Sequence, residues 1–252
     1  MGLELSVYGE QETGAIINDL HVPFHDPATL KVVNKFLEEI QPSFLIYNGD
    51  LNDWYQISSF VKNPSRSNML QGDIEELDAI FQYHKTILPN TRRIVQGGNH
   101  EDRLERYMWT RAQEISNLKC LTMEQLYGAE VNEFEYVPFQ EGVLINNVLL
   151  IVHGDLISKH SGMTARSHYE KHGGCGICGH SHRGGSYYKR DRFGVWGWWE
   201  NFCLCDLDPD WIKNPNWQQG FSLVHFTSKD MFWVEQVPII GHKFIYGGKR
   251  YD

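Results

Sequence analysis

The sequence predicts an α/β fold, and two patterns indicate it. In the N-terminal half, short apolar runs alternate with segments of helical periodicity, which is the order of βαβ units and predicts a parallel sheet. In the C-terminal half, apolar runs come in pairs joined by short polar turns, which is typical of β-hairpins. Because both arrangements occur in one chain, we expect mixed sheets.

The N-terminal half begins with a short buried strand at residues 15–17. Residues 27–40 carry apolar side chains at helical spacing, and Asp26 before Pro27 is a typical N-cap followed by proline at the first helical position. The later elements of this half are a strand at 44–47, a helix at 73–88 and a strand at 93–95.

The C-terminal half begins with a hairpin at residues 143–152 that turns at Asn146 and Asn147. A helix is expected at 164–172 and a strand at 176–178. Two further hairpins follow, one from 186–190 and 193–199 with its turn at Asp191 and Arg192, the other from 221–226 and 231–237.

No repeat, linker or low-complexity tract divides the chain, so residues 1–252 are interpreted as one domain. Two stretches, 54–71 and 206–219, lack clear periodicity and look like loop insertions. Long loops inside a compact domain are often lids or binding loops. A packed surface loop is an equally good interpretation of both.

Composition limits the function classes. The chain has 252 residues, 41% of them hydrophobic, and a formal charge of −9, which argues against wide nucleic-acid or membrane surfaces. No apolar run approaches the roughly 18 residues of a membrane span. The N-terminal segment lacks the charged and apolar regions of a signal peptide, so we expect a cytoplasmic protein whose five cysteines are reduced.

Five short blocks, each after an apolar run, carry side chains that can bind metal. The blocks are Asp19-Leu20-His21, Gly49-Asp50-Leu51-Asn52-Asp53, Gly98-Asn99-His100-Glu101, His153-Gly154 and Gly179-His180-Ser181-His182. Alone, most of the candidate ligands are explained equally well as turn, loop or core residues. The pair His180 and His182 is the exception, because two imidazoles on one face are costly without a purpose. Together the five blocks follow strand ends, where the ligands of α/β proteins gather.

Local spacing suits ligation. If the chain is extended there, Asp19 and His21 point the same way, and His180 and His182 do likewise. Asn99 and His100 are adjacent and point apart, so Asn99 can bind metal while His100 reaches over the substrate. The glycines at 49, 98, 154 and 179 permit tight turns and close backbone approach.

The ligand chemistry indicates a reaction type. Imidazole, carboxylate and one amide oxygen suit Mn²⁺, Fe, Zn²⁺, Ni²⁺ or Co²⁺ rather than Ca²⁺, and we favour Mn²⁺. Two such ions can hold the attacking and leaving oxygens of an in-line displacement at phosphorus, and Asp50 is the candidate for the bridging carboxylate. The sequence therefore predicts metal-assisted attack on a phosphate ester.

The complete pattern, D-x-H, G-D-x-x-D, G-N-H-[DE], H and G-H-x-H, resembles that of the calcineurin-like metallophosphoesterases, in particular small bacterial and phage-type members. It runs from Asp19 to His182 and leaves the C-terminal part of the chain uncovered. The resemblance implies a four-layer αββα sandwich with a dinuclear centre at one edge. It also implies that one metal is held by Asp19, His21, Asp50 and His182 and the other by Asp50, Asn99, His153 and His180.

The same resemblance implies a mechanism in which a hydroxide between the metals attacks phosphorus. His100 would protonate the leaving group, and Glu101 or Asp53 would orient His100 or a ligand imidazole. Asn52, Arg103 and Arg183 are candidates for contacting the substrate phosphate, although a surface charge is the alternative for Arg103.

Several alternatives stay open. A small phosphodiester or nucleotide-like substrate is favoured, nucleic acid is an optional partner, and a metal-free scaffold is the least favoured function. A nuclease would need a basic track, for which the candidates are Arg66, Arg92, Arg93, Arg103, Arg106, Arg111, Arg183, Arg190 and Arg192. Cys175, Cys178, Cys203 and Cys205 could bind a structural zinc or be buried thiols. The tryptophans at 196, 198 and 199 are expected in the core, with a stacking surface as the alternative.

Overall fold

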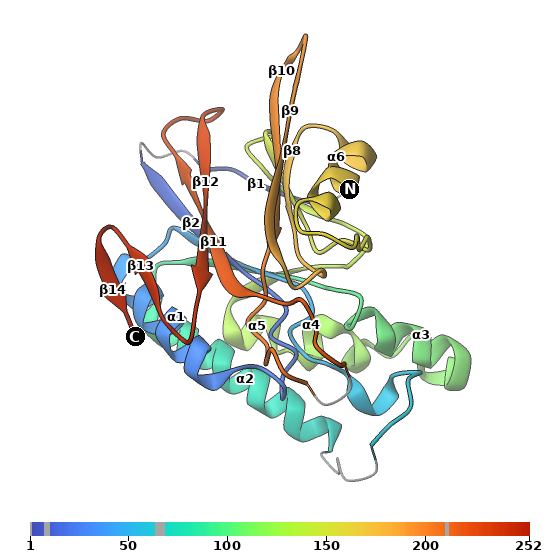
Figure 1. The fold of residues 1–252 in the computed structure, drawn as a ribbon. Helices are drawn as coiled ribbons and strands as arrows, with labels where there is room; N and C mark the ends of the chain where they lie inside the picture. The colour runs from blue at the N-terminus through green and yellow to red at the C-terminus, as the bar shows by residue number, and fades with distance from the viewer. Residues whose placement is uncertain (1, 8–10, 64–68, 210–211) are drawn as a thin grey trace.

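The structure is a computed structural model that describes residues 2–7, 11–63, 69–209 and 212–252. Its described residues form two six-stranded sheets that face each other (Figure 1). One sheet has the order β12 (Phe232–Ile239), β11 (Gln219–Phe226), β2 (Glu12–Ile17), β3 (Phe44–Asn48), β4 (Arg92–Gln96) and β5 (Phe134–Val137). The other has the order β1 (Leu3–Leu5), β6 (Val143–Ile145), β7 (Leu149–Val152), β8 (Cys175–Cys178), β10 (Gly194–Asn201) and β9 (Gly184–Asp191).

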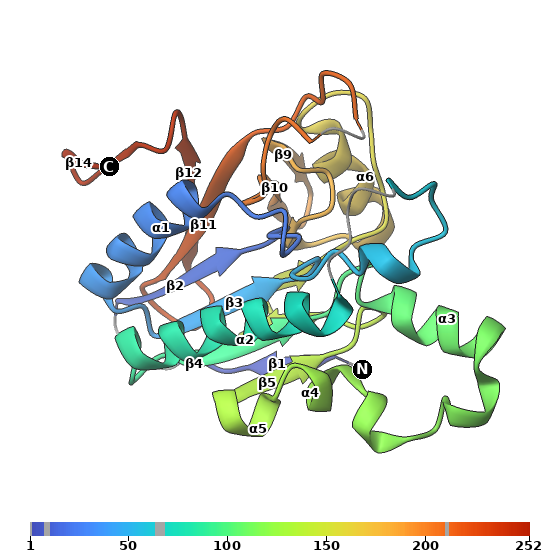
Figure 2. The ribbon, with the colours of Figure 1, turned by 90° about the horizontal axis from the view of Figure 1, so that it is seen from below.

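Helices cover the outer face of each sheet. Figure 2 shows α1 (Pro27–Ile40) and α2 (Leu70–Ile87) beside β2, β3 and β4, and α6 (Met163–His172) packs against β8, β9 and β10 of the other sheet. The remaining elements are α3 (Asp102–Arg111), α4 (Met123–Leu126), α5 (Ala129–Asn132), the hairpin β13 (Phe244–Tyr246) and β14 (Lys249–Tyr251), and short 3₁₀ turns at Tyr55–Ile57, Gln113–Ile115 and Lys119–Leu121. The order helix, sheet, sheet, helix confirms the expected four-layer sandwich.

The apolar pattern explains the layers. Ile16 and Ile46 of one sheet pack with Ile151 and Ile177 of the other, which makes the core between the sheets. Every residue of β3 is buried, because this strand is covered on both faces. The parallel pairing of β2, β3, β4 and β5 confirms the parallel sheet predicted for the N-terminal half.

The helix between the first two parallel strands has the bounds and the cap that the sequence predicts. α1 spans Pro27–Ile40, and the Asp26 carboxylate accepts hydrogen bonds from the amides of Ala28 and Thr29 at 3.0 and 3.1 Å. α2 begins at Leu70, earlier than the predicted residue 73. No described helix has the length and apolar character needed to cross a membrane.

Two hairpins differ in how well their turns were predicted. Asn146 and Asn147 form the expected turn, with φ angles of 51° and 60°. The turn predicted at Asp191 and Arg192 is wrong by one residue, because Asp191 pairs with Gly194 and its carboxylate accepts the amide hydrogens of Phe193 and Gly194. The turn therefore consists of Arg192 and Phe193. Trp198 and Trp199 are buried, which confirms their core placement and excludes them as an exposed stacking surface. Trp196 is only half-buried and donates from Nε1 to the Asp191 carboxylate, so its expected core placement is wrong.

Candidate metal centre

The five blocks meet at one edge of the sandwich, where strands of both sheets end. Asp19, Asp50 and Asn99 follow β2, β3 and β4, while His153 and His180 follow β7 and β8. Backbone hydrogen bonds join these ends, for example from the Asp19 amide to the Gly49 carbonyl at 3.0 Å. Residues far apart in sequence are thus fixed side by side by the sheets.

The backbone around the ligands is not extended, contrary to the expectation for the two i, i+2 pairs. Asp19 and His21 have φ angles of 52° and 53°, and His180 and His182 have 65° and 54°. Asp50 has a φ of 51°. The left-handed conformation is rare for non-glycine residues and clusters at functional sites. Alternate residues still point to one place because the chain curls around the centre.

The first cluster consists of four donor atoms that lie close together. The Nε2 atoms of His21 and His182 are 3.0 Å apart, and His182 Nε2 is 3.0 Å from Asp19 Oδ1. Asp50 Oδ2 lies 3.7 Å from His21 Nε2. Two imidazole nitrogens facing each other so closely with a carboxylate beside them form a typical cation-binding arrangement.

The second cluster shares Asp50 with the first. Asp50 Oδ2 lies 3.3 Å from His153 Nε2, and Asn99 Oδ1 lies 3.2 Å from the same nitrogen. A His180 ring nitrogen lies within 4.8 Å of the Asp50 and His153 donor atoms. Packing here requires glycine at position 98, because a Cβ there would stand 2.1 Å from Asp50 Oδ1.

Outer contacts orient three ligand imidazoles. His21 Nδ1 lies 3.2 Å from Asp53 Oδ2, His153 Nδ1 lies 2.7 Å from the Asn48 carbonyl oxygen, and His182 Nδ1 lies 3.7 Å from Cys205 Sγ. An acceptor at Nδ1 keeps the ring proton there and leaves the Nε2 lone pair free for a metal. Asp53 thus has the orienting contact expected of it.

The charges in the centre suit cations. Asp19 and Asp50 are buried, and Asp19 Oδ1 accepts no hydrogen bond from a described residue although His182 Nε2 lies 3.0 Å away. Burial alone would raise the pKa of Asp50, but His100 and His153 hold it well below its usual value. Burial would lower the pKa of His153, yet Asp50 and Asp19 raise it to about 9. Two buried carboxylates and inward-facing imidazole nitrogens fit divalent metal ions.

His100 stands beside the ligands, within reach of the same space. Its Nε2 lies 3.7 Å from Asp50 Oδ2, and its ring packs edge-to-face against His21 with 4.4 Å between centroids. Its Nδ1 donates to the Asp53 carbonyl oxygen at 2.8 Å. Arg103 Nη2 donates to His100 Nε2 at 2.7 Å, so Arg103 is part of the centre and not a free surface charge.

Glu101 has a different position from the one expected. It is 2% exposed, and its carboxylate accepts backbone amide hydrogens from Asp50, Leu51, Asn52 and Gly98 and the hydroxyl hydrogen of Tyr127. These bonds tie the loop after β3 to the loop after β4. Of the two candidates for orienting an imidazole, Asp53 makes such a contact, whereas the contacts of Glu101 go to the backbone that carries Asp50.

Asn52 and Arg183 lie less favourably for substrate contact than predicted. The Asn52 side chain is fully buried, and its Oδ1 accepts from the Trp54 amide at 3.0 Å. Arg183 donates from Nη1 to the Ser158 carbonyl oxygen, which fixes the loop before α6. These positions support structural roles for both residues.

The cysteines do not form the four-thiolate site considered from the sequence. Cys203 and Cys205 lie with His182 in a group of possible donor atoms. Cys178 Sγ contacts the Trp199 carbonyl oxygen, and Cys175 Sγ accepts from the Gly197 amide. The two pairs therefore lie in different surroundings, and burial raises the pKa of the Cys178 and Cys205 thiols.

Both predicted loop insertions approach the centre. The Trp217 ring packs on His182 with 4.3 Å between centroids, and the Phe60 ring lies 5.9 Å from the Arg103 guanidinium carbon. Residues 64–68 and 210–211 of these loops, which include Arg66 and Trp211, lie outside the described residues. The contacts of Trp217, Phe60 and Cys205 were missed because nothing in their local sequence indicates nearness to a ligand.

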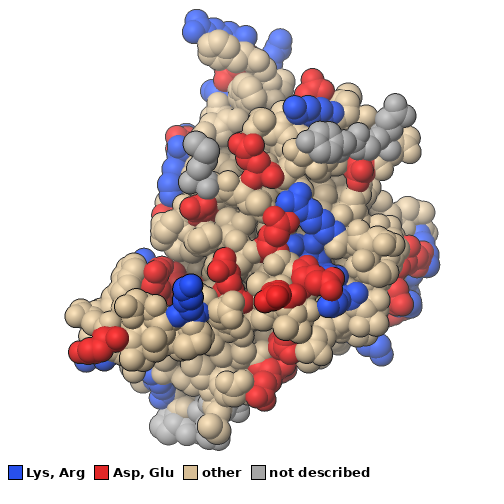
Figure 3. All heavy atoms as spheres, turned by 180° about the vertical axis from the view of Figure 1, so that it is seen from behind, with Lys and Arg blue, Asp and Glu red and all other residues tan. Residues whose placement is uncertain are grey.

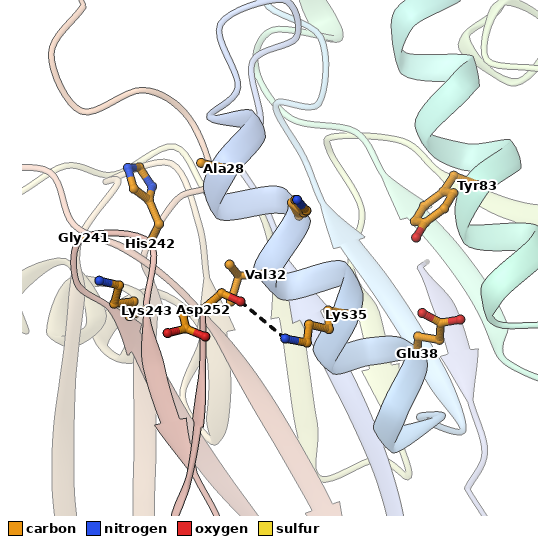
Figure 4. Close-up of a pocket in the computed structure, with 10 residues that line it drawn as sticks. Ala28, Val32, Lys35, Glu38, Tyr83, Gly241, His242, Lys243 and Asp252 are labelled. Atoms are coloured by element: carbon orange, nitrogen blue, oxygen red, sulfur yellow. Dashed lines mark hydrogen bonds between the residues drawn. The ribbon is translucent and has the colours of Figure 1, made fainter.

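A separate cavity of about 630 Å³ lies away from the centre (Figure 4). It is formed by the outer face of α1, Tyr83 of α2 and the turn at 241–243, and three lysines line it, Lys31, Lys35 and Lys243. None of the candidate metal ligands lines this cavity, so it is not part of the metal centre.

Comparison with known proteins identifies the family. The chain is 24% identical to the Gene 54 proteins of Mycobacterium phages D29 and L5, over 94% of this chain and 97% of each relative. Vacuolar protein sorting 29 from Cryptosporidium parvum superposes with a TM-score of 0.48 and 11% identity, over 96% of this chain and 95% of that one. The family model for calcineurin-like phosphoesterases matches residues 15–219. The chain therefore belongs to the calcineurin-like phosphoesterase family.

Proposed function

We propose that this protein hydrolyses small phosphodiesters of the nucleotide type with two bound divalent cations. Membership in the family indicates a metal-dependent hydrolase of phosphoesters. The observation that carries the proposal is the position of the Asp50 carboxylate, which lies 3.7 Å from His21 Nε2 and 3.3 Å from His153 Nε2, between two sets of ligands. A shared carboxylate is what a pair of closely spaced metals requires.

The ligands divide into two sets around Asp50. One cation would be held by Asp19, His21, Asp50 and His182, and the other by Asp50, Asn99, His153 and His180. When bound, such ions supply a nucleophile at neutral pH by acidifying water and offset the charge that develops on the phosphate oxygens. The mixed nitrogen and oxygen donors favour Mn²⁺ as the first ion to test.

His100 and Arg103 would act on the substrate in sequence. A guanidinium only donates, so His100 Nε2 is an acceptor while Arg103 occupies it. A substrate phosphate is a stronger hydrogen-bond partner for Arg103 than the neutral His100 ring, because the phosphate and the guanidinium carry opposite charges. Once Arg103 turns to the phosphate, His100 Nε2 can take up a proton from solvent and deliver it to the leaving oxygen, while its Nδ1–H stays on the Asp53 carbonyl oxygen.

The nuclease alternative gains no support from the arginines. Arg92 pairs with Glu135, Arg106 pairs with Asp102, and Arg93 is buried. Arg190 and Arg192 lie at the tip of the β9–β10 hairpin. The candidate ligand His182 precedes the other end of this hairpin, at the start of β9. On the face seen in Figure 3, acidic side chains are interspersed among basic ones. These five arginines therefore lend no support to a track along a nucleic-acid backbone.

The test is a substrate panel with protein loaded with Mn²⁺: p-nitrophenyl phosphate, bis-p-nitrophenyl phosphate and single-stranded DNA. We expect the diester to be hydrolysed fastest and Asp50→Asn to abolish turnover. Preferred cleavage of DNA would favour the nuclease. If the loaded protein cleaves none of the three, the enzymatic proposal is wrong and a binding scaffold takes its place.

A further inference from the structure

Successive ring contacts connect Trp217, through His182 and His21, to His100. The Trp217 ring is 4.3 Å from the His182 ring, His182 is 4.9 Å from His21, and His21 is 4.4 Å from His100. His100 is the proposed proton donor, so the leaving group of the substrate belongs beside His100. The part of the substrate that stays on the phosphate then has the His182 side of the centre, where Trp217 lies.

The backbone holds Trp217 in place. The next residue, Gln218, donates its amide hydrogen to the His182 carbonyl oxygen at 2.9 Å, and its own carbonyl oxygen accepts from the Cys203 amide at 3.1 Å. Trp217 is therefore fixed to the same loop that carries the ligand. A rigid aromatic ring loses little entropy when another ring stacks on it.

Trp217 also has surface to offer. Its side chain is half-buried, and its plane makes an angle of 61° with the plane of His182. In such an edge-to-face contact, at most one face of the indole is used by His182. Because the indole is only half-buried, part of its surface is open to a flat partner, and every nucleobase has a face that can stack there.

We propose, on the basis of the function proposed above, that Trp217 binds the nucleobase of the arm that stays on the phosphate. The substrate is then a nucleoside 5′-phosphodiester, and the product retained on the His182 side is a nucleoside 5′-monophosphate. Hydrolysis adds water across the bond from phosphorus to the leaving oxygen, which departs as an alcohol with the proton from His100.

The decisive experiment compares two substrates with the same leaving group in Mn²⁺-loaded protein. p-Nitrophenyl thymidine 5′-phosphate keeps a base on the phosphate, and methyl p-nitrophenyl phosphate keeps only a methyl group. We expect the wild type to prefer the first, and Trp217→Leu to lose about tenfold of that preference, mainly through KM. Trp217→Tyr should restore most of it, because stacking needs an aromatic ring and not an indole.

A binding measurement makes the test independent of turnover. Thymidine 5′-monophosphate should bind the loaded Trp217→Leu protein about tenfold more weakly than wild type, whereas inorganic phosphate should bind both equally. Trp233→Leu is the matched control, since this tryptophan is 67% exposed on β12 and lies outside the centre. Trp233→Leu should change neither the preference for the thymidine diester over the methyl diester nor the affinity for thymidine 5′-monophosphate relative to inorganic phosphate.

Two outcomes would overturn the assignment. If Trp217→Leu binds less metal and loses activity on both substrates alike, Trp217 only packs against His182. If the preference for the thymidine diester is unchanged in Trp217→Leu, the base binds elsewhere. In both cases the wild type still hydrolyses diesters, so the proposed function stands. If the loaded wild type cleaves neither diester, the proposed function fails first and this inference fails with it.

Discussion

Arg103 Nη2 and His100 Nε2 are 2.7 Å apart, and the same guanidinium donates from Nη1 to the Asp53 carbonyl oxygen at 2.7 Å. His100 donates to that carbonyl oxygen as well. The three residues thus form a closed arrangement in which Arg103 holds the nitrogen that proton transfer would use. In the proposed mechanism, substrate binding opens this arrangement.

Replacing Arg103 tests this arrangement. Arg103→Lys keeps the charge but loses the forked donor, so one amine cannot hold the phosphate as two guanidinium nitrogens do. We expect kcat/KM to fall on the order of tenfold or more, with KM rising. Steady-state kinetics on bis-p-nitrophenyl phosphate measures this. Arg106→Lys, one turn further along α3 and exposed, is the matched control and should behave as wild type. Equal kinetics for Arg103→Lys and wild type would contradict a role in phosphate binding.

His100→Ala should keep both metals and lose turnover on poor leaving groups. Its side chain is not among the proposed ligands, and a general acid contributes roughly 10²–10⁴ in rate. The loss should be small for p-nitrophenolate, which leaves without protonation, and large for an alkoxide. The test measures metal content and the rates of hydrolysis of a p-nitrophenyl ester and an alkyl ester. Equal losses of rate on these two esters would rule out the role of His100 as general acid.

Glu101→Gln should destabilise the protein and weaken metal binding together. One carboxylate oxygen accepts amide hydrogens from Asp50 and Gly98 at 2.9 and 2.7 Å, and the other accepts from Leu51 at 3.0 Å. An amide group turns one of these acceptors into a donor, which costs about 1–3 kcal/mol of unfolding free energy. Chemical denaturation and chelator competition measure the two effects. A variant with normal stability and lower kcat alone would favour direct catalysis.

Cys205→Ala should weaken metal binding without abolishing folding. The thiol is 3.7 Å from His182 Nδ1, and outer partners of this kind typically contribute 10–100-fold to metal affinity. Competition with a chelator gives the affinity directly. Cys120→Ala, at an exposed position, is the control. Unchanged affinity in Cys205→Ala would mean that His182 is oriented by packing alone, for instance against Trp217.

His84 should make the fold sensitive to acid. Burial, with a smaller contribution from Arg93, lowers its pKa from 6.5 to about 3. Between these values the unfolded chain binds a proton and the folded protein does not, so stability falls as pH drops below about 6.5. From pH 7.5 to pH 5, we expect wild type to lose about 2 kcal/mol more than His84→Gln does.

Urea denaturation at the two pH values checks this. His160→Gln, at an exposed position, should keep the wild-type pH dependence. If His84→Gln loses as much stability as wild type, other groups carry the acid sensitivity.

The parts of the fold that could be predicted are those with strong local signals. α1 was predictable to the residue because its periodicity, cap and first proline agree. β5 and β1 were missed because short edge strands such as Phe134–Val137 and Leu3–Leu5 have no pattern of their own and form only by pairing with β4 and β6. The β9–β10 turn moved by one residue because the side chain of Asp191 caps it.

The sequence by itself determined the chemistry of the centre, because ligand type and order along the chain do not depend on how the strands are placed. It named Asp19, His21, Asp50, Asn99, His153, His180 and His182 as candidate ligands and His100 as the group set apart. Only the tertiary structure decided how these groups face one another and what stands around them. The left-handed curl at Asp19, the backbone contacts of Glu101, and the places of Arg103, Cys205 and Trp217 beside the histidines of the centre all depend on long-range pairing between strand ends and loops. Such contacts arise when distant segments pack, so no short stretch of sequence contains them.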